Sequence, residues 1–441
     1  MMNSAPTVSP HRSRGARHGR QWRAVGWTRP LLIGAALVSA AGSLLWTAAV
    51  SGFEQPRVTL AFGVLVALGE FARITLPGGR EAAPIASASA MSYAFLFTIA
   101  GDPVPHSGVQ VVAVVAVGMA LGELPHVMVG RPPHWGDLAR RLLNVAVIAL
   151  LFRPLVALID LEGPLWWMAL LLMAVIVVGV WAADSVAAAA IRADRLRTRF
   201  GVTVRDEMRA QVAIGMAVGA SAILMALSVH VMGLTTLLVF TAPLLVTQVA
   251  FRRYAQIRLT YLQTVRALSR VTEVGGYVET GHSHRVSRLA QGIGRELGMS
   301  ESELLELEYA ALMHDIGQLS LRDPIPSGAT VLASPPEQRS IAELGSAIVR
   351  ETGVLDGVAE LVRRQCEPYT GDGEAGPPPL GSRIIKVANA FDDLVGGSAD
   401  RDRVEAVLQR LRMDTGHEYD PVVVEALATV LQRPDFHWRG D

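Results

Sequence analysis

The sequence predicts an all-α protein: a polytopic α-helical membrane domain followed by a cytoplasmic helical bundle. Three observations support this prediction. Apolar runs of spanning length recur before residue 252, and the more polar sequence after it has helical periodicity. The third is charge: residues 1–251 hold 19 basic and 12 acidic side chains, a net +7, whereas residues 252–441 hold 21 and 28, a net −7.

The composition excludes several classes of protein. Charged residues make up only 18% of the 441, below the roughly 25% of soluble domains, so a wholly cytosolic globular protein is not expected. The glycines show no period and Cys366 is the only cysteine, which excludes collagen-like and disulfide-stapled chains. The acidic second part argues against nucleic acid as a partner. Lys386 is the only lysine among many arginines, a bias typical of high-GC coding.

Residues 1–29 are predicted to be a disordered basic cytoplasmic tail. They contain six arginines without apolar periodicity, and an apolar run follows at once. Basic flanks orient membrane helices, which favours a topogenic role over nucleic-acid binding. The run Leu31–Val50 is long enough to span a bilayer and further runs follow it, so a cleaved signal peptide is not expected.

Residues 30–251 are predicted to form a membrane domain of about eight transmembrane helices. Apolar stretches near the ~20 residues needed to span a bilayer recur throughout this part. The third and fifth stretches are the least clear. The eight stretches are 31–50, 58–76, 85–101, 108–129, 138–159, 164–190, 210–231 and 234–251.

Arginine placement predicts how this domain is oriented. With the amino terminus inside, the inside loops contain the arginines between 73 and 80, 131 and 141, and 192 and 209, whereas the outside loops contain little beyond Arg57. Short cytoplasmic loops are typically Arg-rich. Eight crossings also return the chain to the starting side. We therefore expect a multi-pass protein of the cell membrane, with the lipid bilayer as a partner and both termini cytoplasmic.

Two Gly-Glu pairs, Gly69-Glu70 and Gly122-Glu123, lie near the inside ends of the second and fourth predicted helices. Carboxylates within a membrane are functional candidates by default. Near the interface, however, a carboxylate can reach water or pair with Arg73, so a structural role is favoured. The sequence shows no clear polar site at the bilayer midplane, which makes transport a minor hypothesis.

Residues 252–275 are predicted to be a helical linker, because this segment lacks Gly and Pro up to Val274 and places one side-chain stripe at alternating steps of three and four. Two interpretations remain open. The helix packs on its own domain, or it forms a coiled coil in a homodimer and passes membrane rearrangements onward. The stripe consists of Tyr254, Ile257, Tyr261, Thr264, Leu268 and Val271.

Two histidines lie on predicted buried helix faces after residue 276. His282 heads an apolar stripe that ends before Gly298, and Ser300 with Glu303 forms a capping box for the next helix. His314 continues the apolar face of that helix, and Asp315 follows it directly. Imidazole and carboxylate together suit zinc, iron or manganese, so these residues are a candidate divalent-metal site.

Residues 276–441 resemble the HD superfamily of metal-dependent phosphohydrolases, and more closely its HD-GYP branch of cyclic dinucleotide phosphodiesterases. The similarity covers about residues 277–430 and implies a compact all-helical bundle, so that the fold class becomes a membrane domain followed by a cytoplasmic HD-type bundle. Four motifs occur in the order and spacing of the family: Gly281–Val286, Ala310–Gly317, Ser382–Asp392 and Tyr419–Pro421.

The resemblance implies metal ligands at His282, His314, Asp315 and Asn389, and catalytic positions at Asp315 and Gln318. Two of these depart from the family pattern. Gln318 stands where the family has a lysine that meets substrate phosphate, so a neutral amide replaces a point charge. Asn389 stands where the family has a metal-binding aspartate, and an amide oxygen holds a cation more weakly than a carboxylate.

Three further departures concern the HD-GYP branch. The branch has a histidine four residues before the glycine that corresponds to Gly345, and this chain has Ile341 there. Where the branch has a His-His-Glu block, this chain has Gln365-Cys366-Glu367. The GYP motif is absent from the corresponding region, 371–377. Cys366 is expected to be an ordinary buried thiol. We therefore expect at most one weakly held divalent cation (Mn, Fe, Zn or Mg). Two hypotheses follow: a hydrolase acting on a nucleotide or cyclic dinucleotide through a degenerate site, and a catalytically inactive receptor or interaction module controlled by the membrane region.

Overall fold

The computed structural model describes residues 28–438, which leaves nearly all of the predicted basic tail 1–29 outside the description. Within this range the described residues are all but 77–79, 100–101, 132, 160–166, 197, 199, 322–324, 326–327, 354, 371–375, 397–399 and 434–435.

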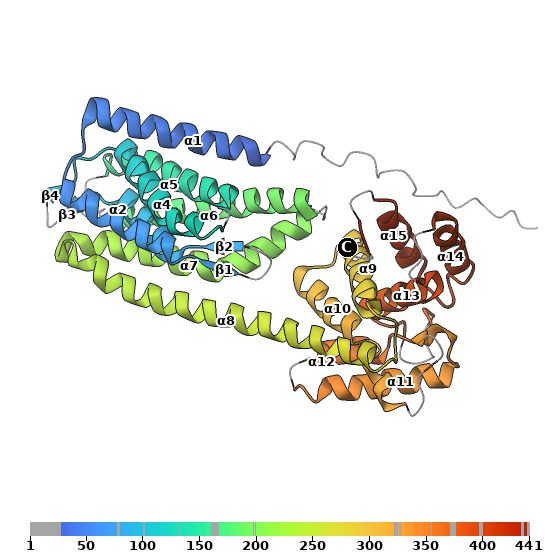
Figure 1. The fold of residues 1–441 in the computed structure, drawn as a ribbon. Helices are drawn as coiled ribbons and strands as arrows, with labels where there is room; N and C mark the ends of the chain where they lie inside the picture. The colour runs from blue at the N-terminus through green and yellow to red at the C-terminus, as the bar shows by residue number, and fades with distance from the viewer. Residues whose placement is uncertain are drawn as a thin grey trace, which may run out of the picture.

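The predicted all-α fold is confirmed. Helices dominate both parts of the described chain, and the strands are confined to two short antiparallel hairpins, in which β1 (Ile74–Leu76) pairs with β2 (Arg80–Ala82) and β3 (Thr98–Ile99) with β4 (Asp102–Pro103). Figure 1 shows the membrane domain as a bundle of roughly parallel rods, with the C-terminal domain at one end of it. The first eight helices are α1 (Thr28–Trp46), α2 (Pro56–Phe71), α3 (Pro84–Phe95), α4 (Gly108–Met128), α5 (Trp135–Val156), α6 (Trp167–Leu196), α7 (Phe200–Met232) and α8 (Thr235–Val274).

Five helices of the described residues are long and apolar enough to cross a membrane: α1 with the π-helical turn that extends it to Ser51, α4, α6, α7 and α8. Each of the eight predicted apolar stretches contains a helix, but α2 has 16 residues and α3 has 12, which is short of a full span. The second and third stretches continue into hairpin strands, and an apolar run alone does not distinguish a strand from a helix. Helix α5 has 22 residues but carries three arginines.

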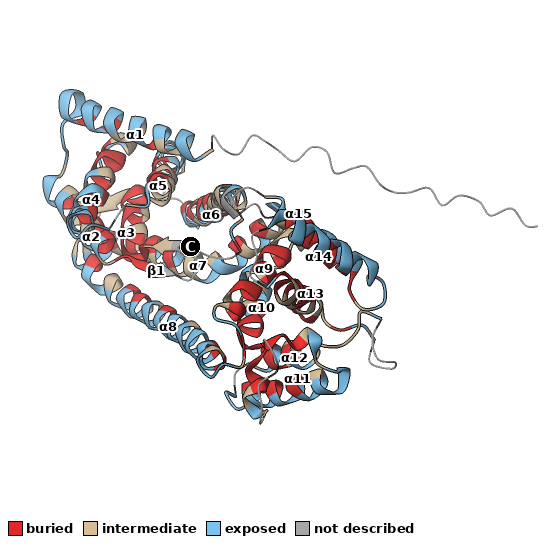
Figure 2. Ribbon diagram, turned by 45° about the vertical axis from the view of Figure 1, so that its right-hand side comes forward, coloured by how far each residue is buried: buried red, intermediate tan, exposed pale blue. Residues whose placement is uncertain are grey.

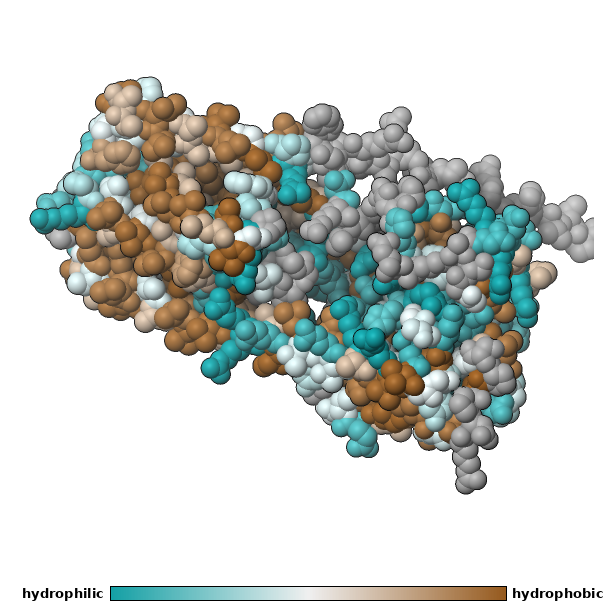
Figure 3. Space-filling view, in the orientation of Figure 1, coloured by the Kyte–Doolittle hydropathy of each residue, from teal (hydrophilic) through white to brown (hydrophobic). Residues whose placement is uncertain are grey.

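The surface of the membrane domain is apolar. Side chains such as Val38, which is 74% exposed, cover the outward face of α1, and similar residues cover α4, α6 and α7. Figure 2 shows α1 and much of α8 as exposed, and Figure 3 shows hydrophobic residues over the membrane domain and hydrophilic ones over much of the C-terminal domain. Large exposed apolar surfaces of this kind fit a lipid environment.

The two Gly-Glu pairs lie where α2 packs closely on its neighbours. A Cβ on Gly69 would lie 2.3 Å from the backbone nitrogen of Ala86 in α3, and one on Gly122 would lie 2.4 Å from the carbonyl oxygen of Ala67 in α2. The adjacent carboxylates are buried and paired. Glu123 forms an ion pair with Arg73, which also lies 3.2 Å from Glu81, and Glu70 pairs with Arg141. We refer to Glu70, Arg73, Glu81, Glu123 and Arg141 as the membrane charge cluster.

Helix α8 continues without a break from the membrane domain into the predicted linker and ends at Val274. Its buried residue Val265 belongs to the core of the C-terminal domain, so one face of the linker packs on that domain. The predicted stripe lies largely on the other side: Tyr254, Ile257 and Val271 are exposed. The described chain therefore leaves this stripe uncovered, and its role in a dimer stays a prediction.

The C-terminal domain is a bundle of seven described helices with a core formed mainly by α9, α10, α13 and α15. The predicted capping box of Ser300 and Glu303 is present, and Gly298 ends α9 in the left-handed conformation. The described part of the domain also contains two 3-10 turns, Ile316–Ser320 and Thr330–Leu332. The helices are α9 (His282–Leu297), α10 (Glu301–Met313), α11 (Pro335–Arg350), α12 (Asp356–Arg363), α13 (Leu380–Val395), α14 (Arg401–Met413) and α15 (Pro421–Leu431).

Helix α10 connects the membrane domain with the interior of the C-terminal domain. At its start the backbone N–H of Glu301 donates a hydrogen bond to Asp206 of α7 (3.0 Å), and the Glu301 side chain pairs with Arg192 of α6. Near its middle Glu308 pairs with Arg266 of α8 at 2.9 Å. Its last turn leads directly into His314 and Asp315.

Candidate metal centre

His282 is held at the start of α9 with its ring inside the domain. The preceding Gly281 adopts φ 80°, a conformation that glycine reaches without strain, and the side chain of His282 is nearly fully buried. Its ring Nδ1 donates a hydrogen bond to Asp392 of α13 (2.8 Å). Arg285, one turn along α9, donates through Nε to the same carboxylate at 2.9 Å. The two contacts fix the ring so that Nε2 points away from Asp392.

His314 follows the last residue of α10 and is also buried. Its Nδ1 lies 2.8 Å from the carbonyl oxygen of Ala311, which can only accept, so Nδ1 carries a proton. Gln365 donates to the backbone carbonyl of His314 at 2.7 Å and holds this turn in place. In the neutral ring Nε2 therefore has a free lone pair.

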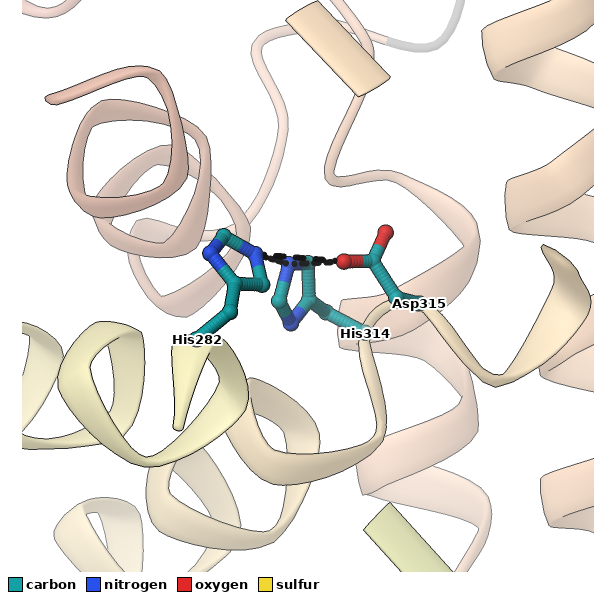
Figure 4. A group of neighbouring side chains, drawn as sticks. All are labelled: His282, His314 and Asp315. Carbon is teal, nitrogen blue, oxygen red and sulfur yellow. Dashed lines mark hydrogen bonds and ion pairs between the residues drawn. The ribbon is translucent and has the colours of Figure 1, made fainter. Parts of the chain in front are cut away.

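Asp315 and Asn389 complete the cluster, and Figure 4 shows the two rings and the Asp315 carboxylate directed toward one another. Asp315 Oδ2 lies 3.2 Å from His282 Nε2 and 3.0 Å from His314 Nε2, and the two ring nitrogens are 3.3 Å apart. Asn389 Oδ1 lies 3.1 Å from His314 Nε2, and its Nδ2 donates to Thr330 Oγ1 at 2.8 Å. The amide oxygen of Asn389 thus faces the cluster.

The pKa values of these groups show how strongly the ring nitrogens attract positive charge. Burial lowers the pKa of His282, but hydrogen bonds to Asp315 and Asp392 outweigh burial and raise it to about 10. Burial also lowers the pKa of His314, and the charge of Asp315 more than reverses this. Burial raises the pKa of Asp315, whereas the two histidines hold it well below its usual range. The cluster therefore binds protons at its centre in the absence of another cation.

The donor set fits a divalent cation. Both Nδ1 protons are committed to Asp392 and Ala311, so once Nε2 of each ring is deprotonated, the two Nε2 atoms, Asp315 Oδ2 and Asn389 Oδ1 are four converging acceptors. Two imidazoles, one carboxylate and one amide oxygen are ligands that zinc, iron and manganese accept. A carboxylate behind a ligand histidine, as Asp392 lies behind His282, is the usual outer contact at such sites. Among the described residues, His282, His314 and Asp315 form the one group of three or more His, Cys, Asp or Glu side chains close enough together to hold a metal ion.

The structure places Gln318 elsewhere. It lies in the 3-10 turn after Asp315, is fully buried, and donates through Nε2 to the carbonyl oxygen of Gly328 at 3.3 Å. Its side chain does not line the cavity beside the cluster. A contact between Gln318 and substrate phosphate, which the resemblance implied, therefore stays a prediction without support from its position.

A cavity of about 230 Å³ opens beside the cluster. Asp315 and Asn389 form part of its wall, so a ligand in the cavity can reach the metal position from one side. The other lining residues include both charged and neutral polar groups. They are Thr330, Val331, Gln338, Ile341, Gln365, Cys366, Lys386, Ala390, Leu394, Arg410, Leu411, Asp414, Glu418 and Tyr419.

Three positions that depart from the HD-GYP pattern, Ile341, Gln365 and Cys366, also line this cavity. Ile341 and Gln365 offer no metal ligand of the kind expected there, and Cys366 contacts the carbonyl oxygen of Gln338 through Sγ at 3.4 Å. Burial raises the pKa of the Cys366 thiol to about 12, so the thiol stays protonated. Cys366 is of intermediate exposure, so its role as an ordinary buried thiol stays a prediction. The region of the missing GYP motif, 371–377, lies mostly outside the described residues.

The sequence interpretation missed three residues that surround the cluster. Asp392 and Arg285 form the charged pair behind His282, and Asp393 lies 3.8 Å from His282 Nδ1. Burial raises the pKa of Asp393 to about 6. The sequence spacing could have indicated two of them. Arg285 lies three residues after His282, and Asp392 lies three residues after Asn389, so each pair shares one helix face.

Comparisons with known proteins agree with the motifs. Residues 277–423 match the HD domain family. A cyclic di-GMP phosphodiesterase of Thermotoga maritima is 27% identical over 189 residues, covering 40% of this chain and 50% of the relative. The cyclic di-GMP phosphodiesterase response regulator RpfG of Xanthomonas campestris pv. campestris is 27% identical over 176 residues, covering 37% and 47%. The chain thus spans about half the length of these curated relatives.

Among solved structures, a cyclic GMP-AMP specific phosphodiesterase from V. cholerae is similar at 21% identity, covering 39% of this chain and 49% of that one. The TM-score is 0.31, which is too low to indicate a shared fold. The family match, the curated relatives and the His-His-Asp cluster point the same way. Residues 277–423 of this chain match the HD domain, which with the curated relatives supports an HD-superfamily phosphohydrolase, and helices long and apolar enough to cross a membrane precede this domain.

Proposed function

We propose that this protein is a membrane-anchored signalling phosphohydrolase whose HD domain holds a single divalent cation and hydrolyses a phosphoester of the cyclic dinucleotide class. One observation supports the metal site above all others: a cation that displaces the ring protons meets four converging acceptor atoms, one each from His282, His314, Asp315 and Asn389. The substrate class comes from the names of the curated relatives.

Each residue around the cluster has a defined part in this proposal. Asp392 orients His282, the carbonyl oxygen of Ala311 orients His314, and Thr330 turns the Asn389 amide oxygen inward. A divalent cation in such a site polarises a phosphoryl oxygen and lowers the pKa of bound water, which makes water a nucleophile at neutral pH. The surrounding helices exclude bulk solvent, since both histidines and Asp315 are buried.

The same residues limit the rate. Asn389 contributes no negative charge, so the site holds a cation more weakly than one with a second carboxylate. Gln318 supplies no cation to the phosphoryl group, because it is neutral and buried. The cavity of about 230 Å³ lies below the ~300–1,000 Å³ typical of ligand sites, so a cyclic dinucleotide enters only in part. We expect turnover well below the ~10 per second typical of enzymes.

Purified full-length protein in detergent tests this proposal. We expect up to one divalent cation per chain by elemental analysis, and slow release of linear dinucleotide from cyclic di-GMP by chromatography. The variant His314→Ala removes a ligand and should abolish both. Gln338→Ala, a cavity variant outside the cluster, should retain the metal. Equal metal content in the unmodified chain and His314→Ala would refute the site.

A catalytically silent receptor is the second candidate, and the two neutral replacements, Gln318 and Asn389, favour it. In that case the unmodified chain binds cyclic di-GMP with no hydrolysis over many hours. Helix α10 offers a route for control by the membrane region, because it contacts Asp206 and Arg192 at one end and leads into His314 at the other. Binding with and without product formation separates the two candidates.

The membrane part of the proposal concerns orientation and assembly. We propose that the HD domain is cytoplasmic, since the arginines of the inside loops gather at its end of the bundle, and that α8 pairs with a second copy through Tyr254, Ile257, Tyr261, Leu268 and Val271. Replacing Ile257 and Tyr261 with glutamate should convert a dimer into a monomer in sedimentation of the detergent-solubilised chain. The same change at Arg252 and Arg253, outside the stripe, is the control. A dimer that survives the stripe variant would refute the pairing.

A further inference from the structure

Lys386 lies in the wall of the cavity beside the candidate metal centre. It is on α13, three residues before Asn389, and therefore on the same helix face. Asn389 and Asp315 line the cavity together with it. The lysine is thus a cation that faces the same space as two of the metal-site residues.

The ammonium of Lys386 is held by three acceptors. Its Nζ donates to the carbonyl oxygens of Cys366 (3.0 Å) and Glu367 (2.9 Å), and it pairs with Glu418 at 2.6 Å. The lysine side chain is only 11% exposed, whereas that of Glu418 is 41% exposed. Two of the three contacts are backbone atoms, and the third is an exposed carboxylate on the solvent side.

The composition shows how unusual this position is. Lysine and arginine total 40 in the chain, and 39 of them are arginine. A guanidinium carries five donors in a planar fork, whereas an ammonium is a compact charge with three donors. Three converging acceptors in a small cavity match the ammonium, so the one lysine stands where its geometry is required.

Resting on the proposed function, we propose that Lys386 binds the phosphate group of the substrate, with phosphate oxygens replacing the Glu418 carboxylate. Glu418 then occupies the anion position in the absence of substrate and moves to solvent when phosphate enters. Lys386 supplies the point charge that Gln318 does not. Arg410 lines the same cavity and pairs with no carboxylate among the described residues, so it adds positive charge to the phosphate position.

Binding of inorganic phosphate to the full-length chain, measured by calorimetry, tests this inference without relying on turnover. Removing the competing anion with Glu418→Gln should tighten phosphate binding several-fold. Removing the cation with Lys386→Met should weaken it about tenfold or more, as expected for loss of a charged hydrogen bond. Lys386→Arg should restore part of the affinity, because the charge returns with a different shape.

The double variant separates binding from a structural role. If Glu418 competes with phosphate for Lys386, Glu418→Gln should have no effect in a Lys386→Met background, since the two side chains act on one another. A lysine that merely ties Cys366 and Glu367 to α13 predicts instead a lower melting temperature for Lys386→Met and no gain for Glu418→Gln. That pattern, or no phosphate binding by the unmodified chain, would overturn the inference.

Metal content distinguishes this failure from failure of the proposed function. We expect Lys386→Met and Glu418→Gln to keep the metal content of the unmodified chain, because neither side chain lies within the His-His-Asp cluster. Absence of metal in the unmodified chain refutes the proposed function, while phosphate binding that depends on Lys386 and Glu418 would still support the anion site.

Discussion

Two clusters of buried charged side chains, one in each part of the molecule, differ in how their charge is balanced. In the membrane charge cluster every carboxylate lies beside an arginine: Glu70 beside Arg141, and Glu81 and Glu123 beside Arg73. In the HD domain the side-chain atoms of His282, His314, Asp315 and Asn389 face one another, and the Arg285 guanidinium is directed to Asp392 instead.

This difference separates a structural cluster from a functional one. Burying a charge is costly unless it is paired, so a chain that buries carboxylates normally supplies their cations itself. The membrane domain does so, and its glycines at 69 and 122 allow the helices to approach closely enough. The HD domain leaves the position open for a proton or a metal ion. Burial of a carboxylate alone therefore does not identify a site, whereas a missing counter-charge does.

The largest expected effect comes from Asp315→Asn, which keeps the shape of the side chain and removes the only ligand charge in the HD cluster. We expect it to abolish divalent-metal binding, because two neutral imidazoles and two amide oxygens leave the cation without a negative ligand. Elemental analysis of the full-length variant after dialysis measures this. Retention of the metal of the unmodified chain would show that the ion is bound elsewhere.

Glu70→Gln, in the membrane charge cluster, should lower stability and leave metal binding unchanged. It leaves the buried Arg141 guanidinium without its partner, and removing one member of a buried pair typically costs about 3–5 kcal/mol. We expect a lower melting temperature in detergent with unchanged metal content. The double variant Glu70→Gln with Arg141→Gln removes both charges and should be less destabilised than Glu70→Gln alone. If Glu70→Gln instead abolishes metal or substrate binding while leaving stability intact, the membrane cluster has a functional role.

Asp392→Asn tests the contact behind His282. Loss of an outer contact to a ligand histidine typically weakens metal binding about 10–100-fold. The amide still fits the space but accepts less strongly from His282 and Arg285, so we expect weaker metal affinity with the fold retained. Titration of metal-stripped protein with Mn²⁺ measures the change. Unaltered affinity would mean that His282 is oriented by the helix alone.

The smallest expected effect is an increase in metal affinity. Asn389→Asp adds a carboxylate oxygen where the amide oxygen now faces the cluster, and should tighten metal binding about tenfold, equal to about 1.4 kcal/mol. The matched variant Gln338→Glu adds a carboxylate to the cavity wall at a residue outside the cluster. It should give no such gain. Weaker binding in Asn389→Asp would show that Asn389 does not face the ion.

Much of this was predictable from the sequence. The helical stripe and the His-Asp doublet predicted that His282, His314 and Asp315 are buried, and the capping signals predicted the boundary between α9 and α10. The contacts of Asn389 could not be predicted from the sequence. Thr330, which orients the Asn389 amide, lies 59 residues away along the chain, so only the fold shows that the two side chains meet. The burial of Gln318 could not be predicted from the sequence either, since the direction of a side chain in a 3-10 turn depends on the loop that packs against it.

The membrane domain shows the same limit. Apolar runs predicted its eight helical segments, but hydropathy does not show where an apolar run leaves a helix for a hairpin, as it does after Phe71 and Phe95. Pairing of Glu123 with Arg73 was anticipated from their positions near one interface. Pairing of Glu70 with Arg141 was not, because it depends on how α5 packs against α2.

Titration of metal-stripped full-length protein with Mn²⁺, compared between the unmodified chain, His314→Ala and Glu70→Gln, tests the central contrast most directly. We predict one site per chain in the unmodified protein, the same site in the folded fraction of Glu70→Gln, and none in His314→Ala. No binding by the unmodified chain, or binding that survives His314→Ala and disappears in Glu70→Gln, would contradict the assignment of the metal centre to the HD domain.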